Sequence, residues 1–126
     1  MSRVVIVLLF TFFSLHAVEW KTYEEALKLQ KKSSKIIMID VMRSNCHFCI
    51  DMCREVFGDK KMSAWLEERF ILVKLNLDTD AVPLDIEVSM TPTFFFVDKN
   101  QKIVKKIPGA WNIEDFKSLT QKIKGE

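Results

Sequence analysis

Two cysteines, Cys46 and Cys49, are separated by only two residues and are the side chains of this chain best suited to chemistry. Thiols at this spacing can form and break a disulfide within one turn of helix, and the thiolate form of a cysteine is a nucleophile. The same pair can also form an inert structural disulfide or bind a soft metal ion such as Cu(I). The motif predicts reversible disulfide chemistry. The elements around the motif distinguish this prediction from a structural disulfide or a metal site.

The periodicity of apolar residues predicts how the cysteines are positioned. Residues 35–42 form a nearly continuous apolar run, which is typical of a buried strand. From Cys46, apolar or thiol side chains recur at helical spacing as far as Phe57. We therefore expect a strand that leads directly into a core-facing helix, with the first cysteine at the start of that helix.

The remaining elements complete one domain. Thr22 and Glu25 form a capping box that predicts a first helix to about residue 32. Further elements are predicted as a helix around residues 62–66, strands at 70–77, 93–97 and 102–107, and a closing helix that Asn112 caps and that runs to residue 123. A strand–helix–strand unit followed by a strand–strand–helix unit predicts an α/β fold with a central mixed β-sheet flanked by helices.

Residues 1–17 differ in character from the rest of the chain. Arg3 precedes an apolar stretch over residues 4–13, and small residues follow as far as Ala17. This order is typical of a secretory signal peptide, and the stretch is too short to span a bilayer of about 30 Å. We predict a signal peptide over residues 1–17 and a folded domain over residues 18–126. A buried helix or an uncleaved anchor is the alternative.

The composition is that of an ordinary globular domain. The 126 residues are 48% hydrophobic and 29% charged, with a net charge of +2, which suits a single core. The lysines are spread along the sequence without a basic block, so we expect no nucleic-acid partner. Export would place the cysteines in an oxidising compartment, and the ending 123–126 is not a retention signal. We expect a periplasmic or secreted protein.

The order of these features resembles the thioredoxin family over nearly the whole domain. Cys46 and Cys49 match the family's nucleophilic and resolving cysteines, and Asp40, six residues earlier, matches its buried acid. Lys74 matches the lysine beside that acid, and Pro92 matches the cis-proline that faces the disulfide. The resemblance implies a thioredoxin fold. An Asp40 that only pairs with Lys74, and an ordinary trans Pro92, are the alternatives.

The resemblance also implies that the two thiols have different roles in the reaction. Cys46 begins a helix, where free N–H groups and the positive end of the helix dipole favour a thiolate, so it is expected to attack the substrate disulfide. Cys49 lies one turn deeper and is expected to resolve the mixed disulfide, with Asp40 taking its proton through water. The Cys46–Cys49 disulfide is itself the redox group, and no further cofactor is expected.

A third cysteine, Cys53, makes the number of cysteines odd. Along a helix it lies about 10 Å from Cys46, too far for a disulfide. Its place in the apolar stripe predicts a buried structural thiol, with redox regulation or metal binding as alternatives. A zinc site would need Cys46, His47, Cys49 and Cys53 on diverging sides of one helix, so we predict no metal site. Haem attachment is excluded because Ile50 stands where that motif needs His.

Five residues are expected to contact the substrate: His47, Phe48, Met90, Thr91 and Trp111. The resemblance implies that a substrate chain lies on this apolar rim beside Pro92 and pairs with the loop backbone. For Trp111, packing beneath the last helix is the alternative. Thioredoxin itself has a Trp before the first cysteine and Gly-Pro between the two, and Asn45 and His47-Phe48 replace them here. The redox potential and the substrate depend on this difference.

These observations predict a monomeric thiol–disulfide oxidoreductase that acts on the disulfides of exported proteins. Asp40 and Lys74 favour a reductase, whereas Thr91 and the altered dipeptide are compatible with an isomerase or an oxidase. A membrane electron donor would recharge a reductase, and a membrane acceptor would serve an oxidase. A Cu(I)-binding metallochaperone of the same fold is the alternative from a different functional class.

Overall fold

The centre of the domain is a four-stranded sheet with the strand order β2-β1-β3-β4. The structure is a computed structural model that describes residues 18–125, so the predicted signal peptide lies outside the described residues. The strands are β1 (Ile36–Met42), β2 (Phe70–Asn76), β3 (Thr93–Val97) and β4 (Ile103–Pro108). β1 pairs in parallel with β2 and antiparallel with β3, and β3 pairs antiparallel with β4. The predicted mixed sheet is confirmed.

Four helices surround the sheet: α1 (Tyr23–Ser33), α2 (His47–Glu55), α3 (Lys60–Arg69) and α4 (Ile113–Thr120). The two predicted N-caps are confirmed, because the side chains of Thr22 and Asn112 accept hydrogen bonds from the first turns of α1 and α4. α2 is shorter than its apolar pattern, since Val56 and Phe57 are buried after the helix ends. No helix within residues 18–125 has the length and apolarity needed to cross a bilayer.

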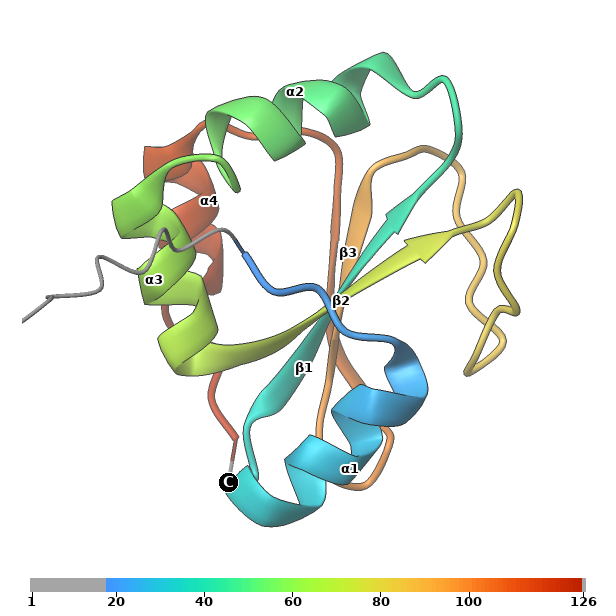
Figure 1. Ribbon diagram of the computed structural model, residues 1–126, viewed down its shortest axis with the longest axis vertical. Coiled ribbons are helices and arrows are strands. Elements are labelled where there is room, and N and C mark those ends of the chain that lie inside the picture. The colour runs from blue at the N-terminus through green and yellow to red at the C-terminus, as the bar shows by residue number, and fades with distance from the viewer. Residues whose placement is uncertain (1–17, 126) are drawn as a thin grey trace, which may run out of the picture.

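The two faces of β1 are buried under different helices (Figure 1). Ile36 and Met38 point into a core shared with α2, α3 and α4, whereas Ile37 and Ile39 point into a core shared with α1. Because side chains alternate along a strand, Asp40 belongs to the same face as Met38 and lies beneath α2. The acid and the cysteine helix are thus placed on one side of the sheet.

Aromatic packing holds the end of α2 and the last helix on this face. The rings of Phe57, Phe94 and Phe116 contact one another edge to face, with centroid separations of 4.8–6.1 Å. All three are buried, so each ring contributes a large apolar area to the core. The cluster fixes the position of α2 relative to β3. It thereby sets how far the cysteine pair lies from the loop before β3.

Candidate active site

The cysteine pair lies where β1 ends and α2 begins. Cys46 is the N-cap of α2, and its Sγ accepts a hydrogen bond from the backbone N–H of Cys49 (3.2 Å between N and Sγ). The two cysteines form a disulfide with a Cα–Cα distance of 5.2 Å. Cys46 is partly exposed and Cys49 is buried, so the two sulfur atoms differ in access to solvent. A macromolecular substrate can reach Cys46 first.

The loop before Cys46 is held by a residue that the sequence reasoning missed. Asp78, just beyond β2, accepts a hydrogen bond from the backbone N–H of Ser44 (2.8 Å) and forms an ion pair with Arg43 (3.2 Å). Asn45 takes the left-handed conformation, with φ at 57°, and turns the chain into the helix. No signal in the sequence singles out Asp78, because its role depends on β1 and β2 being neighbours.

The loop before β3 faces the disulfide. The Thr91–Pro92 peptide bond is cis. The Thr91 hydroxyl donates a hydrogen bond to Cys46 Sγ (3.3 Å), and the Thr91 carbonyl oxygen lies 3.5 Å from the same sulfur. Thr91 therefore contacts the sulfur directly, and its hydroxyl would stabilise a Cys46 thiolate after reduction.

Asp40 is a buried acid beneath α2. It is 3% exposed, and its Oδ1 has no hydrogen-bond partner among the described residues. Burial raises the pKa of Asp40 to about 7, because a carboxylate loses its hydration in the core, and the charge of Lys74 offsets only part of this effect. A carboxyl group with this pKa exchanges its proton near neutral pH. Asp40 is therefore able to accept a proton from a neighbouring acid in the range where thiols react.

Lys74 occupies the predicted place beside Asp40 but turns to other partners. Its ammonium group lies over the ring of Trp20, 4.6 Å from the centroid, and 3.9 Å from the sulfur of Cys53. Among the ion pairs of the described residues none joins Asp40 to Lys74. The interpretation of Asp40 as only a charge partner of Lys74 is therefore not supported by a direct contact.

The prediction that Cys53 is a buried structural thiol is wrong. Cys53 is a free cysteine with an exposed side chain. The core face of α2 passes through Cys49, Met52 and Val56, which are all buried, and Cys53 follows Met52 by about 100° around the helix. It therefore lies on the flank of α2 that faces Lys74, outside the core.

Three of the predicted contact residues are exposed apolar side chains on segments that adjoin the pair, and we call them the apolar rim. Phe48 is 60% exposed, Met90 49% and Trp111 38%. Trp111 lies against α2 through a hydrogen bond from its backbone N–H to Met52 Sδ (3.2 Å), and the N–H of Gly109 bonds to the Pro92 carbonyl (2.8 Å). The loop that carries Trp111 is thus joined to the loop that carries Pro92.

His47 is exposed at the start of α2. Its Nε2 lies 3.4 Å from Asp51 Oδ2, one turn along the helix, and its ring contacts that of Phe48 edge to face. His47 thus points toward solvent beside Cys46 and contributes a polar group to the rim. Within residues 18–125 no three side chains of the types His, Cys, Asp and Glu gather into a group that could hold a metal ion.

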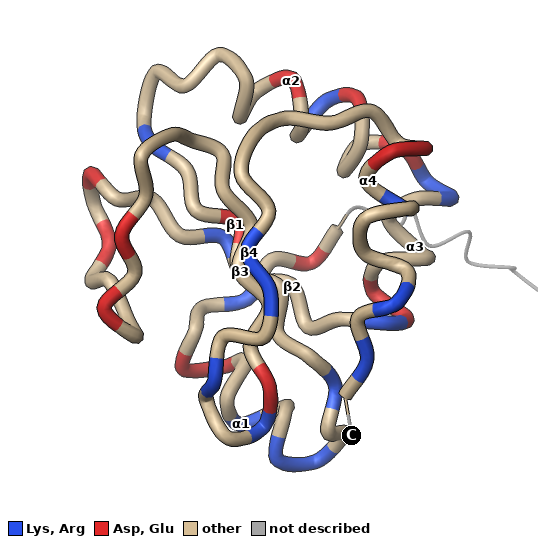
Figure 2. The backbone as a smooth tube through the Cα atoms, turned by 180° about the vertical axis from the view of Figure 1, so that it is seen from behind, with Lys and Arg blue, Asp and Glu red and all other residues tan. Residues whose placement is uncertain are grey.

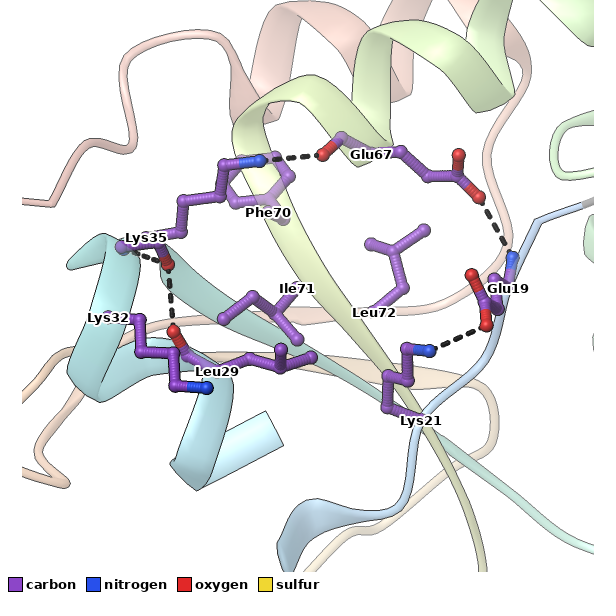
Figure 3. A pocket seen from close by; sticks show the side chains of 10 residues that line it. Glu19, Lys21, Leu29, Lys32, Lys35, Glu67, Phe70, Ile71 and Leu72 are labelled. Atoms are coloured by element: carbon purple, nitrogen blue, oxygen red, sulfur yellow. Dashed lines mark hydrogen bonds and ion pairs between the residues drawn. The ribbon is translucent and has the colours of Figure 1, made fainter. Parts of the chain in front are cut away.

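A hollow at the edge of the sheet is separate from the cysteine pair (Figure 3). It has a volume of about 320 Å³ and is lined by side chains of the N-terminal segment, α1, α3 and the start of β2. Two of the lysines that line it are engaged, since Lys21 pairs with Glu19 (2.7 Å) and Lys35 Nζ donates to the Glu67 carbonyl (3.2 Å). The described residues that line it include no cysteine or histidine, so we place the candidate active site at Cys46 and Cys49.

Comparison with curated proteins shows distant relatives that are longer than this chain. The human anterior gradient protein 2 homolog is 30% identical over 92 residues, which cover 73% of this chain and 52% of that protein. Anterior gradient protein 2-B of Xenopus laevis is 27% identical over 96 residues, which cover 75% of this chain and 58% of that protein. The chain thus spans little more than half the length of the curated relatives it matches.

Comparison with solved structures and with family models identifies the domain. A thioredoxin from Thermus thermophilus superposes with a TM-score of 0.71 at 29% identity, covering 84% of this chain and 87% of that one. A putative disulphide-isomerase from Bacteroides thetaiotaomicron shares the fold, with a TM-score of 0.69 at 19% identity and coverage of 86% and 97%. The family model described as a thioredoxin-like domain matches residues 23–124. This chain therefore belongs to the thioredoxin-like domain family.

Proposed function

We propose that this protein is a thiol–disulfide oxidoreductase that reduces disulfides of exported proteins, with Cys46 as the nucleophile and Cys49 as the resolving thiol. The observation that carries the proposal is the asymmetry of the pair. Cys46 is accessible at the start of α2 and contacts the Thr91 loop, whereas Cys49 is buried one turn deeper. A helix start favours the thiolate of its capping cysteine, so the accessible sulfur is also the reactive one.

The reaction begins with the reduced pair. The Cys46 thiolate attacks one sulfur of the substrate disulfide, so that a Cys46–substrate bond forms and the substrate S–S bond breaks. The first substrate thiolate leaves and takes a proton from water. The Cys49 thiol then loses its proton and attacks Cys46 Sγ, which forms the Cys46–Cys49 disulfide and releases the second substrate thiol. The substrate gains two electrons, and the protein loses two.

Asp40 serves the second step of this reaction. Its pKa of about 7 makes it a suitable acceptor for the Cys49 proton, because a general base works best when its pKa is near the working pH. A water molecule between the carboxylate and Cys49 would relay this proton. Lys74 assists by favouring the charged form of Asp40.

A substrate chain would lie on the apolar rim of Phe48, Met90 and Trp111 and beside Pro92, with His47 as a polar contact. Exposed apolar groups of this size around a reactive sulfur suit an extended polypeptide, whose backbone can pair with the loop before β3. The predicted signal peptide supports a reaction in the periplasm or outside the cell. A reductase there needs an electron donor, and we assign this role to a membrane protein that exchanges thiols with the Cys46–Cys49 disulfide.

One observation favours the opposite direction of electron flow as the second candidate. The Thr91 hydroxyl at 3.3 Å from Cys46 Sγ stabilises a thiolate and with it the reduced pair, which is the property of an oxidant or isomerase. Equilibration of the pair with defined ratios of reduced and oxidised glutathione distinguishes these directions. A potential close to that of thioredoxin, about −270 mV, supports a reductase, and one near −120 mV supports an oxidase.

Reduction of insulin by dithiothreitol tests the proposed function. The wild-type chain is expected to accelerate the precipitation of reduced insulin, and Cys46→Ser is expected to abolish the acceleration. At about pH 6.5 iodoacetamide should label Cys46 first in the reduced protein, because a thiolate reacts and a thiol does not. Full activity of Cys46→Ser would exclude the proposed mechanism. Binding of one Cu(I) per chain through the thiols, without disulfide exchange, would support the metallochaperone alternative.

A further inference from the structure

Lysines that are scattered in the sequence meet at one end of the fold. Two adjoining hollows lie there, and Lys122 and Lys124 line both of them. Lys99 and Lys102 also line the first hollow, and Lys117 contributes to the second. Lys105 lines the first hollow too, but its Nζ donates a hydrogen bond to the Leu119 carbonyl (2.9 Å). The other five lysines are exposed, and we call them the basic face. Figure 2 shows Lys and Arg segments gathered near the C-terminus, at the end of the molecule away from α2.

The strand register places the basic face opposite the cysteine pair. Val97, at the end of β3, pairs with Ile37, near the start of β1, so the turn at residues 98–102 lies at this end of the sheet. Gly125 lies there too, because a Cβ on it would meet the Ser34 carbonyl oxygen. Cys46 follows the other end of β1. The length of one strand, about 20 Å, therefore separates the basic face from the reactive sulfur.

The charge of the basic face is not neutralised by acids within residues 18–125. None of the five lysines belongs to an ion pair of these residues. Among residues 18–125, Asp98 is the one acidic residue that lines the two hollows, and its Oδ1 accepts hydrogen bonds from the backbone N–H groups of Asn100 and Lys102 (2.9 and 3.0 Å). This carboxylate is used to close the turn. The surface thus presents positive charge to an external partner.

We propose that the basic face binds the anionic headgroups of a phospholipid membrane. Lysines act as point charges, which suits a surface of many diffuse negative charges, and Arg69, which lines the second hollow, already donates a hydrogen bond to the Gln121 carbonyl. The neighbouring aromatic ring, Trp65, lies between Arg69 and Lys117 and is not free to stack on a base, which disfavours single-stranded nucleic acid. The face is therefore suited to a lipid surface.

A domain bound through the basic face would keep Cys46 directed away from the lipid and open to substrates. The proposal rests on the exported location proposed above and not on redox activity.

Cosedimentation with vesicles tests the proposal. The purified protein is mixed with vesicles of phosphatidylcholine alone or with about 30% phosphatidylglycerol, a typical anionic content, at low and high salt. We expect binding to the anionic vesicles to exceed binding to the neutral ones and to fall as salt rises. Because Lys122→Glu/Lys124→Glu reverses two of the five charges of the basic face, it should weaken anionic binding about tenfold or more.

The matched control carries the same change of charge elsewhere. Lys60→Glu/Lys61→Glu alters two exposed lysines at the start of α3, outside both hollows, and should retain most of the anionic binding. Insulin reduction by both variants verifies that they are folded. Equal binding to the two kinds of vesicle, or equal loss in the two variants, would overturn the proposal. Binding of duplex DNA as tightly as of anionic vesicles would also overturn it and would assign the face to nucleic acid.

Discussion

Lys74 stands directly opposite Asp40 in the parallel register of β1 and β2, and yet the two side chains form no ion pair. The ammonium group is directed to the Trp20 ring and the Cys53 sulfur, while Asp40 Oδ1 is buried without a hydrogen-bond partner within residues 18–125. Lys74 therefore relieves the burial of the carboxylate only in part. This explains why the pKa of Asp40 is raised to about 7 and not held near its ordinary value.

The buried acid makes the stability of the protein depend on pH. The pKa of Asp40 is raised from 3.8 to about 7, so between these pH values the folded state binds more protons than the unfolded state. The contribution of Asp40 to the free energy of unfolding is therefore most favourable below about pH 4. It falls by on the order of 4 kcal/mol as the pH rises to about 7. Asp40→Asn should be more stable than the wild type at pH 8 and closely similar at pH 4. Urea unfolding at pH 4 and pH 8 measures the difference in unfolding free energy between the variant and the wild type. The same difference at both pH values would contradict the predicted role of Asp40.

The Thr91 hydroxyl should lower the pKa of Cys46. It donates to Cys46 Sγ, and a hydrogen bond to a charged acceptor contributes about 1.5–3 kcal/mol. Thr91→Val should therefore raise the pKa of the Cys46 thiol by about 1 or more, and Thr91→Ser, which keeps the hydroxyl, should restore it. Thiolate absorbance of the reduced protein against pH gives the value. An identical titration of the Val and Ser variants would show that this hydroxyl has no such role.

The exposed ring of Phe48 should contribute to binding of polypeptide substrates. Burial of part of this ring against a substrate contributes about 1 kcal/mol, so Phe48→Ala should raise the KM for insulin about fivefold. A small aromatic disulfide, which does not extend over the rim, should react at a nearly unchanged rate. Val82→Ala is the control, because Val82 is exposed on the loop between β2 and β3 and is not part of the rim. Equal effects of the two substitutions would exclude a specific role for Phe48.

The free thiol of Cys53 should be reactive in the native protein. In the oxidised form Cys46 and Cys49 are joined, so a thiol reagent should modify one cysteine per chain without denaturant. Mass spectrometry of the modified peptide should identify Cys53, and Cys53→Ser should retain insulin reduction within about twofold, as expected for a surface substitution. Modification that requires unfolding would show that the side chain is buried after all.

The elements of the fold follow from local patterns, and this is why the sequence predicts them. Burial imposes the spacing of apolar residues along β1 and α2, and the N-caps at Thr22 and Asn112 mark helix starts through their own hydrogen bonds. These signals require no knowledge of the rest of the chain. The ends of elements are less well defined, because the last predicted helix continues as an apolar pattern to Ile123 while α4 ends at Thr120.

Features that depend on packing between distant segments were not predictable. Met52 and Cys53 both fit an apolar stripe that starts at Cys49, and only the contact of α2 with the sheet shows that Met52 is buried and Cys53 is exposed. The hydrogen bond from Ser44 to Asp78 depends on the neighbouring ends of β1 and β2. The basic face has the same origin, because its lysines come from the β3–β4 turn, α4 and the segment after α4.

Trapping of the mixed disulfide tests most directly that Cys46 is the nucleophile and Cys49 the resolving thiol. Cys49→Ala and Cys46→Ala are prepared in a Cys53→Ser background, so that each reduced protein has a single thiol within the described residues. Each variant is mixed with oxidised insulin, and covalent complexes are analysed by non-reducing electrophoresis and mass spectrometry. The proposed mechanism predicts a stable complex through Cys46 in Cys49→Ala and little or none in Cys46→Ala. A complex that forms through Cys49 as readily as through Cys46 would contradict it.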